Sequence, residues 1–215
     1  MSAHLRITEI FHSLQGEART VGRPTVFVRL TGCPLRCGYC DTAYAFSGGV
    51  LYREEEVLRE VASYSPRYVT VTGGEPLAQP SCLPLLSALC DAGYEVSLET
   101  SGAIDVADVD PRVVKVMDLK TPGSGEELRN LYTNIPHLLR HDQVKFVICD
   151  EKDYAWARAK LSEYQLADKV DDVLFSPSHA SLEPAQLAEW ILRDRLPVRF
   201  QLQLHKYLWA DAAGR

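Results

Sequence analysis

Residues 24–40 read PTVFVRLTGCPLRCGYC, and the change of character within this stretch indicates the fold. The first part, 24–30, is rich in β-branched and aromatic residues, which is typical of a strand. Thr31 and Gly32 end the strand, and a loop with three cysteines follows at once. The sequence therefore predicts a chemically active loop at the carboxyl end of a strand.

The same alternation of strands and helices continues along the chain. Residues 53–64 carry apolar side chains at helical spacing behind three glutamates, which are favourable at a helix N-terminus. Further strands are expected at 68–72, 95–100, 113–118, 144–148, 173–176 and 198–203. Further helices are expected at 83–92, 153–166 and 184–193.

Strands that alternate with helices favour a parallel sheet with right-handed crossovers. The chain has 215 residues, whereas a complete eight-fold barrel typically needs about 250. No linker or internal repeat divides it. We therefore predict a single α/β domain over residues 1–215, a partial (truncated) TIM-like barrel with about six parallel strands.

Composition and charge exclude several classes of protein. No apolar run approaches the roughly 18 residues that span a bilayer, and residues 1–6 lack the apolar stretch of a secretory signal. The formal net charge is −6, without a basic run. We therefore expect a cytoplasmic protein with a small-molecule substrate and with neither nucleic acid nor membrane as a partner.

Cys33, Cys37 and Cys40 lie close together in a C-x3-C-x2-C arrangement. Three thiolates around a four-iron cubane leave one iron open to an external ligand. A zinc site stays an alternative if a distant cysteine or histidine completes it, although zinc sites usually present paired ligands. The other three cysteines stand alone in apolar surroundings and are expected to be buried thiols: Cys82, Cys90 and Cys149.

This cysteine spacing, with aromatic Tyr39 before the last cysteine, resembles that of the radical S-adenosylmethionine (SAM) superfamily. The resemblance implies a 4Fe-4S cluster whose open iron binds SAM, with Tyr39, Cys40 and Asp41 beside the cofactor. Residues 72–76 read TGGEP and follow the next predicted strand. Alone they are consistent with a simple turn, but after the cysteine loop they resemble the superfamily's SAM-binding motif. That motif implies SAM contacts at Gly73, Gly74 and Glu75.

Polar residues also end the later strands of the predicted sheet. Because parallel strands place their carboxyl ends at one edge, we assign Asp118, Lys120 and Lys145 to the SAM site. The turn at Ser176 and Pro177 is assigned there by the same argument. For Asp118 and Lys120, a local ion pair is the structural alternative.

Residues 10–17 (IFHSLQGE), 27–30 (FVRL), 40–42 (CDT) and 203–207 (QLHKY) resemble the 7-carboxy-7-deazaguanine synthase family. The similarity extends from about residue 9 to residue 207. It implies conversion of 6-carboxy-5,6,7,8-tetrahydropterin to 7-carboxy-7-deazaguanine in the queuosine pathway. It also implies a magnesium ion, an electron donor such as flavodoxin or ferredoxin, and a homodimer.

The same resemblance assigns individual site residues. Arg29 offers a planar fork for a substrate carboxylate, Thr42 corresponds to the magnesium ligand, and Gly102 to a SAM contact. In isolation, the Thr42 hydroxyl is also consistent with a turn cap. The resemblance implies no catalytic side chain beyond the cofactor radical, and it gives these substrate contacts: Leu14, Gln15, Gly16, Glu17, Arg29, Thr100 and His205.

The chain departs from the family pattern at two places. Ala18 stands where glycine is usual, and residues 208–215 extend the tail, so a role of the terminal carboxylate is in doubt. Two other functions stay open. A glycyl-radical activating enzyme shares the cysteine spacing but not residues 15–17, and a zinc or redox-sensing module would use the cysteines without a cofactor.

Overall fold

A nine-stranded sheet organises the part of the chain that the computed structural model describes, residues 4–179, 181–210, 212 and 214. The strand order is β3-β1-β2-β4-β5-β6-β7-β8-β9. The strands are β1 (His4–Leu14), β2 (Pro24–Leu30), β3 (Val50–Arg53), β4 (Tyr68–Gly73), β5 (Glu95–Thr100), β6 (Val114–Asp118), β7 (Gln143–Ile148), β8 (Asp172–Pro177) and β9 (Arg199–Phe200). The helices are α1 (Glu54–Ser63), α2 (Cys82–Asp91), α3 (Glu151–Glu163), α4 (Leu166–Lys169), α5 (Pro184–Asp194) and α6 (Leu204–Trp209).

Strand β2 and the strands from β4 to β9 pair in parallel, and the sheet is open. This arrangement confirms the predicted partial barrel. Strand β9 is shorter than the predicted 198–203 because the chain leaves the sheet after Phe200. The backbone N–H of Gln201 still donates to the Phe175 carbonyl at 2.9 Å, and the next residues lead to α6.

The antiparallel strands at the other edge are missing from the sequence prediction. β1 pairs antiparallel with β2 on one side and with β3 on the other. Leu5 and Ile7 are buried while His4 and Arg6 are exposed, the period-two signature of a strand with one buried face. Strand β1 has a functional consequence, because it delivers the loop at residues 15–17 to the edge of the parallel sheet.

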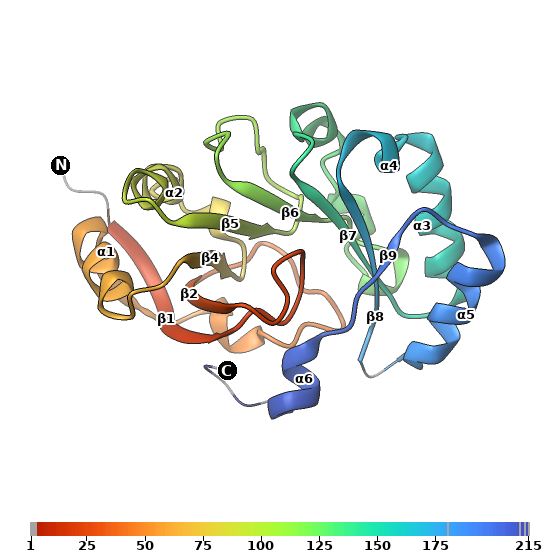
Figure 1. Ribbon diagram of the computed structural model, residues 1–215, viewed down its shortest axis with the longest axis horizontal. Helices are drawn as coiled ribbons and strands as arrows, with labels where there is room; N and C mark the ends of the chain where they lie inside the picture. Colours follow the sequence, from red (N-terminus) through yellow and green to blue (C-terminus); the bar gives the residue numbers. More distant parts are fainter. Residues whose placement is uncertain (1–3, 180, 211, 213, 215) are drawn as a thin grey trace.

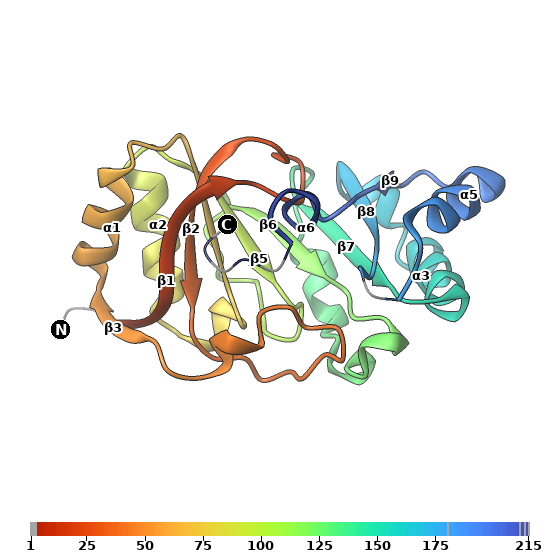
Figure 2. The same cartoon turned by 90° about the horizontal axis from the view of Figure 1, so that it is seen from below.

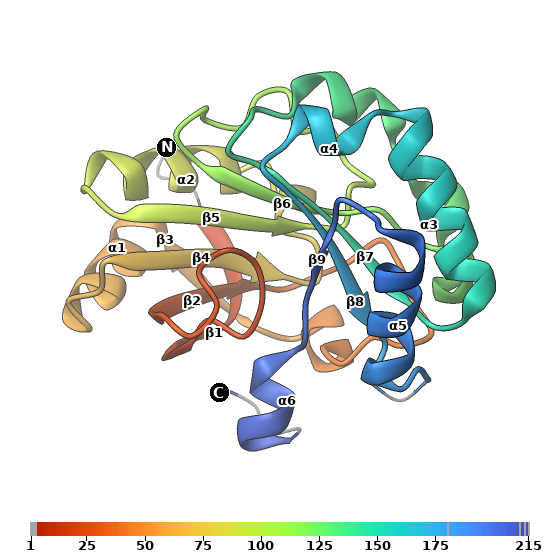
Figure 3. The same ribbon diagram turned by 45° about the vertical axis from the view of Figure 1, so that its right-hand side comes forward.

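The longer helices cover one side of the sheet in two groups (Figure 1). Helices α1 and α2 pack with β1, β2, β4 and β5 around one apolar cluster, and α3 to α5 pack with β6 to β8 around another. Helix α6 lies on the opposite side (Figures 1 and 3). In Figure 2 it lies in front of the strands near β6. No helix in the described ranges is long and apolar enough to cross a membrane.

A buried ion pair joins the start of β6 to the turn before β7. Lys115 Nζ lies 2.8 Å from Asp142 Oδ2, and both side chains are almost inaccessible to solvent. The Asp142 carboxylate also accepts hydrogen bonds from the backbone N–H groups of Lys115 and Leu139, both at 2.7 Å. The pair therefore holds two crossover connections at the end of the sheet remote from the cysteines.

We expect Asp142→Ala to lower the free energy of unfolding by about 3–5 kcal/mol, because Lys115 would be left buried without its counter-charge. Denaturant titration measures the change. The double substitution Lys115→Met with Asp142→Leu removes both charges and should recover most of the loss. Equal stability of Asp142→Ala and the wild type would contradict this role.

Candidate functional site

Loops at the carboxyl ends of the parallel strands meet the loop after β1 and the segment before α6 around one cavity. Its volume is about 460 Å³, within the range of small-molecule sites. Most of the site residues predicted from the sequence, although far apart in the chain, thus line the same cavity. The predicted site residues on its wall are Leu14, Gln15, Gly16, Glu17, Arg29, Cys33, Cys37, Tyr39, Cys40, Asp41, Thr42, Gly73, Gly74, Thr100, Asp118, Lys120, Lys145 and His205.

The three motif cysteines line this cavity from the loop after β2. Burial raises the pKa of the Cys33 and Cys37 thiols. Among the described residues, no group of three or more His, Cys, Asp or Glu side chains is arranged to hold a single metal ion. The fit of an iron–sulfur cluster rests on the donor set, which is three soft thiols from one loop that face one cavity. Of the remaining cysteines, Cys82 is fully buried as predicted, whereas the prediction was wrong for Cys90 and Cys149, which are only partly buried.

Gly74 supports the cysteine loop from the end of β4. Its N–H donates to the Leu30 carbonyl, and the Glu75 N–H donates to the Gly32 carbonyl at 2.8 Å. A Cβ on Gly74 would collide with the Gly32 backbone and would lie 2.7 Å from Cys33 Cβ. Glycine is therefore required here by close packing of the two motif loops.

We expect Gly74→Ala to lower the iron content of anaerobically reconstituted protein several-fold, because the loop that carries Cys33 must shift. Iron and sulfide analysis measures the effect. Gly38→Ala is the matched control, since a Cβ there meets no atom within 4 Å. Full iron loading of Gly74→Ala would show that the cluster loop tolerates the shift.

Glu75 does not line the cavity, although the sequence predicted a SAM contact. It is fully buried, and its carboxylate accepts hydrogen bonds from Thr100 Oγ1 at 3.0 Å and from Ser101 N at 2.7 Å. A further bond comes from Leu77 N at 3.0 Å. Glu75 thus ties the end of β4 to the end of β5 from behind the wall.

Three other predicted contacts also lie off the wall. Gly102 adopts φ +71°, and its carbonyl accepts hydrogen bonds from Leu131 N and Asn134 Nδ2. Ser176 and Pro177 are buried within β8. The cavity at this strand is lined by the two residues that follow, 178 and 179, because the strand continues beyond the predicted turn.

Arg29 reaches the cavity from β2. Its Nε lies 2.7 Å from Glu9 Oε1, and the Tyr44 hydroxyl donates to the same oxygen at 2.7 Å. Its guanidinium carbon lies 5.6 Å from the ring centre of Phe11 and 5.9 Å from that of Tyr44. These contacts hold the guanidinium in place through Nε, and they leave its terminal nitrogens for a ligand carboxylate.

A row of alternating charges crosses the cavity wall. Lys120 Nζ lies 2.9 Å from Asp118 Oδ2, and Lys145 Nζ lies 3.7 Å from the same atom and 2.6 Å from Glu17 Oε2. Burial alone would raise the pKa of Asp118 and Glu17, but the neighbouring lysines outweigh it and lower both. The ion pair predicted as the alternative for Asp118 and Lys120 exists, and it lines the cavity.

Glu99 is a cavity residue that the sequence analysis did not assign. It lines the wall at the end of β5, and Thr72 Oγ1 donates to its Oε2 at 2.9 Å. Burial raises its pKa, and the nearby Glu17 carboxylate adds to the effect. Its place beside Thr100 at a strand end was the available signal. Glu17 and Glu99, which both line the cavity, thus have pKa values shifted in opposite directions.

Two buried polar atoms on the wall lack a partner. Among the described residues, nothing hydrogen-bonds to Asp118 Oδ1 or to the Tyr39 hydroxyl. Buried polar atoms in proteins are normally paired, so these atoms fit a site that a polar ligand completes. The Lys120 ammonium lies near Tyr39, with its Nζ 5.9 Å from the ring centre.

The C-terminal segment closes one side of the cavity. The Leu204 N–H donates to the Gly16 carbonyl at 2.9 Å, and a Cβ on Gly16 would collide with the His205 ring. Asp41 accepts from Lys206 at 3.4 Å and lies 3.7 Å from His205 Nε2. Thr42, the predicted magnesium ligand, donates to Asp41 Oδ1 at 2.8 Å. The cysteine loop and the tail therefore meet at Asp41.

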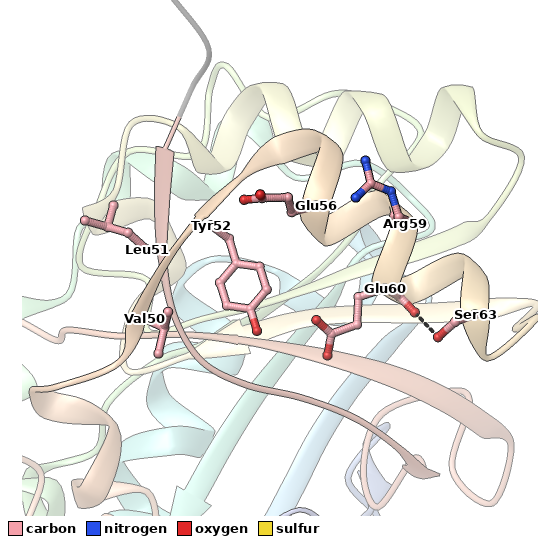
Figure 4. A pocket seen from close by; sticks show the side chains of 7 residues that line it. All are labelled: Val50, Leu51, Tyr52, Glu56, Arg59, Glu60 and Ser63. Carbon is pink, nitrogen blue, oxygen red and sulfur yellow. Dashed lines mark hydrogen bonds between the residues drawn. The ribbon is translucent and has the colours of Figure 1, made fainter.

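A second hollow lies between β3 and α1, away from the cysteines (Figure 4). Its lining includes Tyr52, Glu56 and Arg59, and Glu56 already pairs with Arg53 at 2.8 Å. None of the residues predicted to carry chemistry lies there. The candidate site is therefore the cavity of the cysteine loop.

Comparisons with known proteins find relatives over nearly the whole chain. The radical SAM superfamily matches residues 27–118. The 7-carboxy-7-deazaguanine synthase of Chlorobaculum tepidum is 46% identical, over 99% of this chain and 98% of its own. That of Koribacter versatilis is 43% identical, over 95% and 97%. The crystal structure of QueE from Escherichia coli has a TM-score of 0.77 at 24% identity, covering 94% of this chain and 95% of that one, and supports the fold.

Proposed function

Because the chain belongs to the 7-carboxy-7-deazaguanine synthase family of radical SAM enzymes, we propose that it is a carbon–nitrogen lyase of the 7-deazapurine pathway that leads to queuosine. The reaction converts 6-carboxy-5,6,7,8-tetrahydropterin into 7-carboxy-7-deazaguanine and ammonia. The observation that carries the proposal is the single cavity that holds both the cysteine loop and the residues of the QGE segment.

The residues present fit the cofactors of this reaction. Cys33, Cys37 and Cys40 would hold a 4Fe-4S cluster, and the unpartnered Asp118 Oδ1 would accept a hydrogen bond from SAM. When bound, these groups supply the 5′-deoxyadenosyl radical that removes a hydrogen atom at C6 of the pterin. Magnesium is a further proposal, supported by the Thr42 hydroxyl at the cavity wall and by the preference of that ion for oxygen ligands.

The chain's own residues bind and orient the substrate. Arg29 presents its terminal guanidinium nitrogens to the 6-carboxylate, while Glu17 accepts from the N–H groups of the pterin ring. The tail around His205 covers the cavity and keeps water from the radical. This arrangement favours a small substrate over the protein loop that a glycyl-radical activating enzyme must admit.

Partners and assembly are proposed with the function. A flavodoxin or a ferredoxin would reduce the cluster, and the protein would act in the cytoplasm as a single-domain chain. A homodimer is supported by the open edge strand β3, where Val50 and Leu51 are 64% and 55% exposed. Light scattering of the purified protein tests the oligomeric state.

The deciding experiment is an anaerobic assay of the reconstituted protein with SAM, a reductant, magnesium and the carboxytetrahydropterin. Release of the deazapurine and of ammonia supports the proposal, and omission of magnesium tests that ion separately. A protein that contains zinc and no iron after anaerobic purification would contradict the proposal and favour the zinc or redox module.

A further inference from the structure

The sequence assigned Lys145 to the SAM side of the cavity, but its side chain contacts the substrate side, on the loop after β1. The strand-end argument placed it with SAM, yet its Nζ lies 2.6 Å from Glu17 Oε2 on the loop after β1. Both side chains are largely buried, with 15% and 12% exposure. A charge-assisted hydrogen bond at this distance and burial is among the strong ones.

The Glu17 carboxylate is held at both oxygens. Gln203 Nε2 donates to Oε1 at 2.8 Å, while Lys145 binds Oε2. Each oxygen of an ionised carboxylate has two lone-pair sites, so each keeps one for a ligand. The two protein donors therefore orient the carboxylate, and each of its oxygens can still accept one hydrogen bond from a ligand.

The two lysines of the cavity wall lie on different sides of the cavity, one near the cysteine loop and one near residues 15–17. Lys120 pairs with Asp118 at 2.9 Å and lies 5.9 Å from the ring centre of Tyr39 on the cysteine loop. Lys145 approaches Asp118 only to 3.7 Å and is paired with Glu17 instead. Lys120 therefore belongs to the side of the cluster, and Lys145 to the side of the QGE segment.

We propose that Lys145 is a positioning residue for the substrate: it orients the Glu17 carboxylate and supplies its counter-charge, so that Glu17 accepts from two adjacent N–H groups of the aminopyrimidinone edge. This inference rests on the proposed function. The other charged groups that act on Glu17 and its partners come from different elements, namely Glu99, Asp118, Arg29 and His205. Among the cations of the described residues, Lys145 alone forms an ion pair with Glu17.

We expect Lys145→Met to raise the KM for the pterin roughly 10- to 100-fold, which corresponds to one lost hydrogen bond to a charged group. The KM for SAM should change far less, because Lys120 stays paired with Asp118 at 2.9 Å while Lys145 approaches it only to 3.7 Å. Lys145→Arg should recover part of the loss, because it restores the charge. Lys152→Met, at an exposed position on α3, is the matched control.

A double-mutant cycle separates positioning from a direct or a merely structural role. If Lys145 acts through Glu17, the double variant with Lys145→Met and Glu17→Gln should have the same KM for the pterin as Glu17→Gln alone. Additive effects, or a loss of SAM affinity in calorimetry as large as the loss of pterin affinity, would overturn the inference. Absence of product from the wild-type protein would instead contradict the proposed function. In that case, calorimetry of pterin binding to the wild type, the two single variants and the double variant still tests the role of Lys145.

Discussion

The protein with Cys37 replaced by Ala is expected to form no deazapurine and to lose most of its cluster iron. Only three thiols of the described chain line the cavity, and a cubane with one ligand fewer would be left with two open irons. Iron and sulfide analysis, visible absorbance and product formation after anaerobic reconstitution measure the effect. The loss should exceed that of any other single substitution discussed for this protein.

Cys149→Ala is the matched control for the cluster. The Cys149 thiol is half-buried outside the cavity, and burial raises its pKa to about 11. Because this thiol does not line the cavity of the cysteine loop, it is not placed to join the three cluster ligands. Iron content and turnover should match those of the wild type. Equal losses from Cys37→Ala and Cys149→Ala would contradict the assignment of the cluster to the loop after β2.

Arg29→Met is expected to lower kcat/KM for the pterin roughly 100-fold or more, since it removes a buried guanidinium from a substrate carboxylate. The side chain is already fixed by Glu9 and by two aromatic rings, so binding of the proposed carboxylate would have little ordering cost. Arg29→Lys should recover little, because the ammonium lacks the fork geometry. Steady-state kinetics with SAM in excess measure both variants.

Arg19→Met controls for general loss of positive charge near the site. Arg19 lies on the same loop as Glu17 but forms a partly exposed pair with Asp171 at 3.1 Å. Surface pairs of this kind contribute little, so the kinetics should stay close to wild type. If Arg19→Met reduced kcat/KM as strongly as Arg29→Met, recognition of the carboxylate would not depend on Arg29.

Local sequence patterns were sufficient to predict the parallel strands and the position of the cysteine loop. The β-rich run of 24–30 and the glycines at 32 and at 73–74, where two of the strands end, are signals contained within a few neighbouring residues. Strand β1 was missed although Leu5 and Ile7 alternate with polar residues. β1 has a neighbour on each side, but few of its positions are fully buried, so its apolar pattern is weaker than that of the parallel strands, which are buried on both faces.

The motif residues near the active-site edge were identified for a similar reason. Parallel strands bring their carboxyl ends to one edge, so the order of strands along the chain already predicts that Cys33, Gly74 and Asp118 meet. The sequence could not separate residues on the wall from those behind it. Glu75 follows a strand end as Gly74 does, yet its carboxylate turns inward to Thr100 and Ser101.

The sequence by itself determined the open parallel sheet, the cluster loop and the family, because each depends on spacing within short segments. Only the tertiary structure decided how the charges pair. The contact of Lys145 with Glu17 joins positions 128 residues apart, and that of Gln203 with Glu17 joins positions 186 apart. Partners at such separations are chosen by the packing of the whole sheet and not by neighbours in the chain.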